Sequence, residues 1–304
     1  MSRILVIRLG AFGDFVLSFG PFAAIRAHHP AANITLLTTA PFAELARKAP
    51  WFDRVEVDAR PAWWNLHGVW RLHLQLRGYN LAYDLQTSAR SSRYFLLAGR
   101  PPWSGIAPGC ALPHANPARN SMHTLERQRE QLAMAGIHDF PVPDLSWLDS
   151  RPFDLPPRFA LLVPGAAPHR PRKRWSADHF AALATLLKAK GITPVVLGTG
   201  AEAPLAATIL RACPGAVDLT GRTQMGDIAG LARRAAVAVG NDTGPMHLIA
   251  AIGCPSVVLF SAESDPALTA PRGGPGGSWP TVLRVPDLAD LPVERVAAAL
   301  PGGH

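Results

Sequence analysis

Residues 3–14 read R-I-L-V-I-R-L-G-A-F-G-D, an apolar run that passes into a turn containing two glycines. Residues 3–8 have the short apolar pattern of a strand in a parallel sheet that is covered on both faces. A helix is expected from about Asp14 to His28, and its first turn would offer free N–H groups to a ligand. Gly10 and Gly13 have no side chain, so a ligand could approach the backbone there. The stretch predicts an α/β fold with a binding site at this turn.

The same alternation of apolar runs and helical patterns continues outward from this stretch. In the first half it predicts strands at 34–39, 55–58 and 81–85 and helices at 41–48 and 121–135. In the second half it predicts strands at 159–163, 193–197, 217–219, 237–239 and 256–260, and a helix at 176–190 that Ser176 caps.

The chain therefore divides into two similar halves. We expect an N-terminal domain at 1–139, a proline-rich linker at 140–157 and a C-terminal domain at 158–304. Each half is predicted to be a doubly wound, Rossmann-like parallel sheet. Ligands of such sheets bind outside the carboxyl ends of the strands, so the expected site is a cleft between the two domains.

Composition narrows the class of protein. Of the 304 residues 48% are hydrophobic and 17% charged, which excludes a disordered chain, and no run of 18 apolar residues predicts a transmembrane helix. Asp14 interrupts the apolar N-terminal run, so we expect a mature cytosolic start. Cys110, Cys213 and Cys254 lack metal-ligand or redox spacing and indicate a reducing compartment. Between Arg60 and Arg129 stand nine arginines and two acidic residues, a balance that favours an anionic partner.

Three loops could carry chemistry. The first, at residues 10–14, is not a G-x-G-x-x-G motif, which disfavours a nicotinamide enzyme, and Asp14 there is either a functional carboxylate or a helix cap. The second, V-P-G-A at 163–166 running into the basic residues 169–174, lies where a phosphate would bind before a capped helix, or is a solvated or nucleic-acid-binding basic loop. The third, at 240–247, again follows a strand and opens a helix that could hold a pyrophosphate.

These loops resemble one family, glycosyltransferase family 9, the bacterial lipopolysaccharide heptosyltransferases. The resemblance lies in I-L-V-I-R-L-G-A-F-G-D at 4–14, P-G-A followed by K-R-W, and G-N-D-T-G-P-M-H-L-I-A-A-I-G-C-P-S-V-V-L-F at 240–260. It implies the GT-B fold, with an acceptor-binding N-terminal domain and a nucleotide-sugar-binding C-terminal domain. It also implies an inverting transfer of heptose from ADP-heptose to an inner-core acceptor without a metal or other cofactor, and the sequence has no D-x-D pair.

The resemblance also implies roles for individual residues. Asp14 matches the family's general base, and an acceptor hydroxyl does need a positioned base to take its proton. A helix N-terminus stabilises a carboxylate and so weakens it as a base, but proton transfer can still occur late in the reaction. The residues carried over to the donor site are Lys173, Asp242, Thr243, Gly244, His247, Glu202 and Met225, and Gly10 and Gly13 fall on the acceptor side.

The sequence departs from the family pattern at two places. Pro21 stands seven residues after Asp14, where many members have proline after six, and the usual F-G-P-T-D-P is replaced by F-S-A-E-S-D-P at 260–266. A transferase of another sugar or a sugar-nucleotide epimerase on the same fold therefore remains an alternative. A nucleic-acid-binding protein is a third, disfavoured because no recognised motif or stacking platform accompanies the basic stretch.

Residues 62–77 leave two interpretations open. Trp63, Leu66, Trp70 and Leu74 recur at helical spacing, with Arg71 and Arg77 among them. Such a helix either packs on its own sheet or rests on anionic lipid beside a glycolipid acceptor. The second interpretation places the protein at the cytoplasmic face of the inner membrane.

Overall fold

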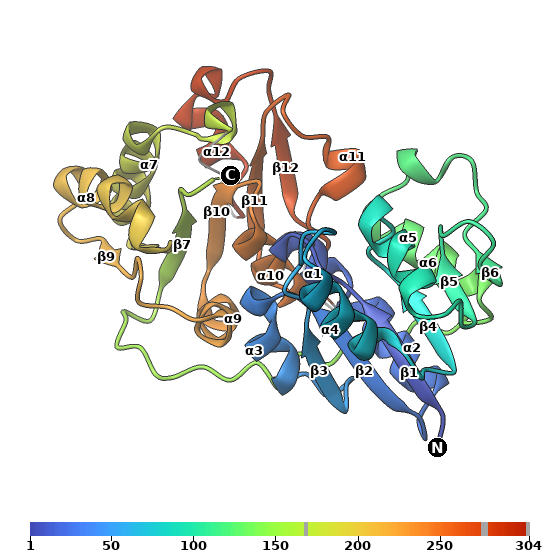
Figure 1. Cartoon of the computed structure of the whole chain (residues 1–304). Coiled ribbons are helices and arrows are strands. Elements are labelled where there is room, and N and C mark those ends of the chain that lie inside the picture. Colours follow the sequence, from blue (N-terminus) through green and yellow to red (C-terminus); the bar gives the residue numbers. More distant parts are fainter. Residues whose placement is uncertain (167–169, 275–278, 302–304) are drawn as a thin grey trace. The chain divides into compact units, whose positions relative to one another are not determined.

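The computed structural model describes residues 1–166, 170–274 and 279–301, and it forms two compact units that divide between Trp147 and Leu148 (Figure 1). Each unit contains one six-stranded sheet in which all paired strands are parallel. Helices cover both faces of each sheet, the arrangement expected when parallel strands are joined by helical crossovers.

The first unit has the strand order β3-β2-β1-β4-β5-β6. Packing between α2 and α6, and separately between α4 and α5, divides the helices between its two faces. Its elements are β1 Arg3–Ile7, α1 Phe12–Leu17, α2 Phe19–His28, β2 Asn33–Thr38, α3 Ala40–Lys48, β3 Arg54–Val57, α4 Leu66–Leu76, β4 Leu81–Asp84, α5 Ala89–Leu97, β5 Trp103–Gly105, β6 Leu112–Pro113, the 3₁₀ turn η1 Arg119–Ser121 and α6 Thr124–Met134.

The second unit has the order β12-β11-β10-β7-β8-β9, which is the same order once each sheet is numbered from its own first strand. Its elements are β7 Phe159–Val163, η2 Pro171–Lys173, α7 Ala177–Ala189, β8 Thr193–Val196, η3 Gly200–Glu202, α8 Ala203–Ala212, β9 Val217–Asp218, α9 Met225–Arg234, β10 Val237–Asn241, α10 Gly244–Ala251, β11 Ser256–Phe260, α11 Pro266–Thr269, β12 Thr281–Arg284, η4 Leu288–Asp290 and α12 Val293–Ala298.

The direction of winding reverses between β1 and β4 in the first unit and between β7 and β10 in the second. Ligands of doubly wound sheets bind at such switch points, beyond the carboxyl ends of the strands. Arg8 and the 10–14 turn follow β1, and Asp242 and Thr243 follow β10. The fold therefore places two of the three loops singled out from the sequence at switch points, and the 163–166 loop follows β7 at the second one.

The expected single helix from Asp14 to His28 is wrong. The structure has α1, which begins at Phe12, and α2, which begins at Phe19, with Ser18 between them. Pro21 explains the break, because a proline within a helix lacks the N–H that would bond to the carbonyl of Leu17 and its ring clashes with that carbonyl. The Ser18 hydroxyl instead donates to the Asp14 carbonyl at 2.8 Å.

The 140–157 stretch contains neither helix nor strand, and its two ends are attached to different units. In the first unit, Trp147 packs edge-on against Trp51 and Phe19. In the second, Arg151 pairs with Asp227 at 3.3 Å. Apolar and charged side chains within this proline-rich stretch thus pack on the unit to which each belongs.

The helix expected within 62–77 is α4, and it shows features of both interpretations. Leu72 and Leu76 are buried in the core of the first unit, so the helix does pack on its own sheet. Trp63 also lies against the protein, with the Arg90 guanidinium 5.0 Å from its ring centre. Leu66 and Trp70, by contrast, stay exposed.

Candidate active site

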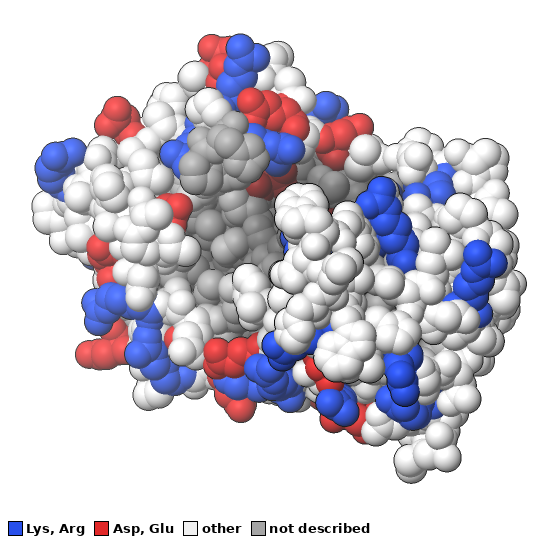
Figure 2. All heavy atoms as spheres, in the orientation of Figure 1, with Lys and Arg blue, Asp and Glu red and all other residues white. Residues whose placement is uncertain are grey.

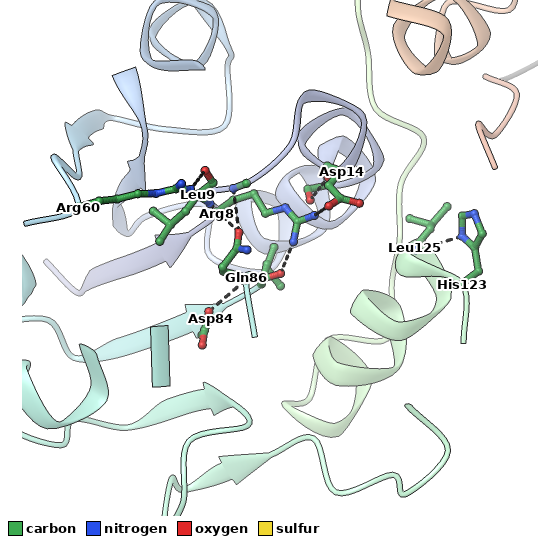
Figure 3. Close-up of polar contacts among 11 residues, drawn as sticks. Arg8, Leu9, Asp14, Arg60, Asp84, Gln86, His123 and Leu125 are labelled. Atoms are coloured by element: carbon green, nitrogen blue, oxygen red, sulfur yellow. Dashed lines mark hydrogen bonds and ion pairs between the residues drawn. The ribbon is translucent and has the colours of Figure 1, made fainter. Parts of the chain in front are cut away.

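The first cluster of polar side chains lies at the switch point between β1 and β4 (Figure 3). Arg8, the residue after β1, is buried, and its guanidinium Nη2 lies 3.3 Å from Asp14 Oδ2. Arg8 Nη1 donates to the Leu85 carbonyl at 2.6 Å. The Asp14 side chain keeps 35% of its surface exposed. Arg8 thus orients a carboxylate that remains accessible to a substrate.

Asp14 is not the N-cap of its helix. The N-cap position of α1 is Ala11, and Asp14 lies in the first turn, where no side-chain capping bond is formed. Of the two interpretations left open by the sequence, the helix cap is therefore wrong. The carboxylate is positioned by an ion pair with a buried guanidinium instead.

Gln86, which follows β4, shapes the glycine turn. Its Oε1 accepts hydrogen bonds from the N–H groups of Leu9 and Gly10, both at 2.9 Å. A Cβ added to Gly10 would lie 3.1 Å from Gln86 Nε2, so the absence of a side chain lets Gln86 lie close to the turn. Gly10 and Gly13, the two acceptor-side residues expected from the sequence, flank this turn.

Asp84, the last residue of β4, is fully buried beneath the cluster. Burial raises the pKa of its carboxyl to about 6, although hydrogen bonds from the N–H groups of Thr87 and Gln86 and the charge of Arg8 offset part of that effect. Burial lowers the pKa of the Arg8 guanidinium, and the carboxylates of Asp14 and Asp84 oppose this shift. The Asp84 charge therefore helps to keep Arg8 charged under Asp14.

Further basic side chains border this cluster from the last part of the first unit. Arg127 of α6 is close enough to Arg8 to contribute to its lowered pKa, and it acts in the same way on Arg119 of η1. Arg119 Nη2 is buried and has no hydrogen-bond partner among the described residues. His114 accepts a hydrogen bond of 3.4 Å from Arg119 Nε. Arg127 thus lies within electrostatic reach of both Arg8 and Arg119, and guanidinium groups are the side chains best suited to bind an anion.

The second cluster lies at the switch point between β7 and β10. Lys173 Nζ lies 2.6 Å from Asp242 Oδ2, and the Ser264 hydroxyl donates to the same oxygen at 2.7 Å. The side chains of Lys173 and Asp242 are only 11% and 9% exposed. These residues come from three separate loops of the second unit, and the ion pair joins two of the predicted donor-site residues.

Thr243 and Gly244 stand at the start of α10. Thr243 is the N-cap, but its hydroxyl donates to the Asn241 carbonyl at 3.2 Å and caps no N–H of the helix. Pro245 has no N–H, and the Met246 N–H donates to the Thr243 carbonyl at 3.1 Å. The N–H groups of Thr243 and Gly244 are therefore the ones that a ligand could use, and the helix dipole favours a negative ligand. His247 follows one turn later and is buried.

Asn241 connects this cluster to the other predicted loop. Its Oδ1 accepts a hydrogen bond of 3.1 Å from the Trp175 N–H, and its Nδ2 donates to the Pro164 carbonyl at 2.8 Å. Trp175 is 1% exposed and its indole N–H donates to the Leu291 carbonyl. The tryptophan of the K-R-W stretch is thus an anchor that fixes the loop carrying Lys173.

Glu202 also lies near this loop. A Cβ on Gly165 would fall 3.0 Å from Glu202 Cγ, so the two residues are neighbours. Glu202 Oε2 accepts hydrogen bonds from the Thr199 N–H and hydroxyl at 2.8 and 2.6 Å. Met225 begins α9 and takes part in none of these contacts. Residues 167–169, which include His169 of the basic loop, lie outside the described residues.

Several residues of the clusters were not found from the sequence. In the sequence, Arg8 is only a polar residue at the end of an apolar strand. Gln86 and Asn241 are residue types that are common at strand ends and in loops, so neither indicates a functional role. Their burial and partners depend on pairing between strands that are distant in sequence, which no local pattern contains. Ser264 lies in the F-S-A-E-S-D-P stretch, where the sequence shows only a departure from the family pattern.

In 1–166, 170–274 and 279–301, no group of three or more His, Cys, Asp or Glu side chains could hold a metal ion. No helix in the same ranges is both long and apolar enough to cross a membrane.

Comparison with known proteins identifies the family. The chain is 25% identical to lipooligosaccharide heptosyltransferase 2 of Haemophilus influenzae, with 88% of this chain and 86% of that protein aligned. Its fold matches the E. coli ADP-heptose lps heptosyltransferase II (TM-score 0.74, 23% identity, 99% and 98% of the two chains). It also matches the E. coli heptosyltransferase WaaC with ADP (TM-score 0.79, 20% identity, 99% and 100%). The fold is therefore GT-B. The model of glycosyltransferase family 9 (heptosyltransferase) matches residues 69–275, more than half of the chain, so this protein is a glycosyltransferase and belongs to that family.

Proposed function

We propose that the protein transfers heptose from ADP-heptose, with inversion at the anomeric carbon, to an inner-core lipopolysaccharide acceptor. The observation that carries the proposal is the Lys173–Asp242 pair beside the open first turn of α10, in a chain of the heptosyltransferase family. Since the acceptor is a membrane glycolipid, the protein acts at the cytoplasmic face of the inner membrane.

The donor binds the second unit. Its pyrophosphate lies at the N-terminus of α10, where Thr243 and Gly244 present N–H groups and the helix dipole favours negative charge. Lys173 supplies the nearest buried cation, and Asp242 holds it in place. Glu202, next to Gly165, contacts the ribose, and Met225 and His247 complete the nucleotide side of the pocket.

Transfer is a single displacement. The acceptor hydroxyl forms the new bond to the anomeric carbon while the bond from that carbon to the ADP oxygen breaks, so the configuration inverts. Asp14 takes the hydroxyl proton as the bond forms. The negative charge that develops on the departing ADP is stabilised by Lys173 and by the N-terminus of α10.

The acceptor binds the first unit. Gly10 and Gly13 lie in the same turn as Asp14, whose side chain keeps 35% of its surface exposed, so a sugar hydroxyl can reach the carboxylate. Arg119 and Arg127 support this assignment, because an anionic inner core needs cations near the reacting hydroxyl.

A transfer assay tests the proposal. Purified protein, ADP-heptose and lipopolysaccharide from a heptose-deficient strain should give released ADP and an acceptor whose mass, by mass spectrometry, has grown by one heptose. Conversion of the donor with no change in acceptor mass would favour an epimerase. Thermal stabilisation by an oligonucleotide but not by ADP-heptose would instead favour nucleic-acid binding, since a ligand in hundredfold excess over its Kd adds about 2.7 kcal/mol to stability.

A further inference from the structure

The outer face of α4 and Trp64, two residues before the helix, expose unusually many apolar side chains. Trp64 is 85% exposed, Leu66 78%, Trp70 57% and Leu74 42%. These are four of the ten large hydrophobic side chains that are exposed among the described residues, and they lie within eleven consecutive positions. A concentration of this kind on a protein surface marks a contact with a partner or a membrane.

The exposed face is not needed to hold the helix in place. Leu66, Trp70 and Leu74 are spaced four residues apart and so share one face of α4. Leu72 and Leu76, on the other side, are 2% and 0% exposed and belong to the core of the first unit. Asn65 caps the helix by accepting from the Gly68 N–H at 2.9 Å. Core packing and capping therefore fix the helix, and the outer face remains free for contact.

The charges around this face are basic. Residues 59–83 contain three arginines, Arg60, Arg71 and Arg77, and no aspartate or glutamate. The nearest acid on a neighbouring strand, Glu56, is already paired with Arg54 at 2.6 Å and accepts from Gln75 of α4. Figure 2 shows the surface over α4 as mostly uncharged, with basic side chains near its lower edge.

We propose that this face, formed by Trp64, Leu66, Trp70, Leu74, Arg71 and Arg77, docks the protein on an anionic lipid bilayer. Tryptophan side chains favour the membrane interface, and exposed arginines beside them attract anionic headgroups. A second copy of the chain fits less well, because a symmetric contact would bring the arginines of both copies together. The role of this docking, which is to bring the enzyme to a glycolipid acceptor, rests on the proposed function. The binding to lipid does not depend on it.

Vesicle flotation without donor or acceptor tests the proposal. Wild-type protein should float with vesicles that contain phosphatidylglycerol and not with phosphatidylcholine vesicles, and salt should weaken the binding. Replacing Arg71 and Arg77 by Gln should weaken it about fivefold per residue. The double variant Trp64→Ser/Trp70→Ser should lose binding, and Trp279→Ser, which changes a 66%-exposed tryptophan of the second unit, should bind as wild type does.

Two outcomes would overturn the proposal. One is equal flotation of the wild type and the Trp64→Ser/Trp70→Ser variant, with both proteins shown to be folded by circular dichroism. The other is a wild-type dimer in sedimentation analysis that the double variant dissolves, which would assign the face to a second copy. Neither measurement involves heptose transfer. The membrane proposal can therefore fail while the proposed function stands, and the proposed function can fail while the membrane proposal stands.

Discussion

In each sheet the fourth strand ends in a buried polar residue, but the two residues differ. Asn241 ends β10 and Asp84 ends β4, and both are 0% exposed. The Asn241 amide is satisfied, with its Oδ1 accepting from Trp175 and its Nδ2 donating to Pro164. Asp84 Oδ1 accepts from the Gln86 N–H, but its Oδ2 has no hydrogen bond among the described residues.

The amide and the carboxylate have different roles at the two switch points. In the second unit, a neutral amide joins two loops, and the charged pair of Lys173 and Asp242 is separate from it. In the first unit, the buried carboxylate of Asp84 acts on Arg8, the guanidinium that orients Asp14. Burying a charge is costly unless it is compensated, so the Asp84 carboxylate lowers the stability of the first unit while it supports Arg8, which orients the proposed base Asp14.

The largest expected effect concerns the accessible carboxylate of the first unit. Asp14→Asn should lower turnover about 10²- to 10⁴-fold, because the amide cannot accept the acceptor proton, while donor affinity and folding stay unchanged. Steady-state kinetics with the lipopolysaccharide acceptor and calorimetry with ADP-heptose measure the two quantities.

Asp178→Asn is the matched control, since Asp178 is also a carboxylate in the first turn of a helix, α7. It should retain full turnover. Near-normal turnover of the Asp14→Asn variant would remove Asp14 from catalysis and turn attention to His247.

The next prediction replaces the buried carboxylate of Asp84 in the first unit by an amide, the group that Asn241 has in the second unit. Burial raises the pKa of Asp84 to about 6 from an ordinary value of 3.8. Stability from this group is therefore fully present below about pH 4 and is lost as pH rises through 6. Between pH 4 and pH 7, Asp84→Asn should gain roughly 3 kcal/mol in unfolding free energy relative to the wild type, the equivalent of about two pKa units. Urea unfolding across this range measures it.

Asp53→Asn provides the control of opposite sign. Partial burial acts to raise the pKa of Asp53, but hydrogen bonds from the Ile34 N–H and Arg26 outweigh it and lower the pKa. Its contribution to stability is present above the ordinary pKa and is lost as pH falls. A gain for Asp84→Asn that does not change with pH would mean that Asp84 has the same pKa in the folded and unfolded protein, and therefore that burial does not raise it.

The fold could be predicted from the sequence further than the site. β7 is apolar along its whole length and β11 is apolar after Ser256, and the structure places both strands where the pattern predicts them. The short strands β5, β6 and β12 were missed, because two to four residues carry little periodicity, and the nine-residue helix α5 was missed as well. Lys173 and Asp242 could be named from a family motif, but their ion pair joins residues 69 positions apart and only the fold reveals it.

The smallest expected effect concerns this ion pair. Lys173→Ala should weaken ADP-heptose binding by about 1.5–3 kcal/mol, the range of a charge-assisted hydrogen bond to phosphate. Lys173 Nζ lies 2.6 Å from Asp242 Oδ2, closer than the 3.3 Å between Arg8 Nη2 and Asp14 Oδ2 in the first unit. The Ser264 hydroxyl also donates to Asp242 Oδ2. Asp242 is therefore expected to hold the cation for the donor rather than to take a proton.

Arg172→Ala is the control for this last substitution, because Arg172 is an exposed cation in the same turn, η2. It should bind ADP-heptose as the wild type does in calorimetry. Asp242→Asn should weaken binding as well, since Lys173 would lose the charge that positions it, and should leave any remaining turnover dependent on Asp14. If a folded Lys173→Ala protein binds ADP-heptose with wild-type affinity, the pair serves only to join the loops, as Asn241 does, and the donor phosphates are held by the N-terminus of α10 alone.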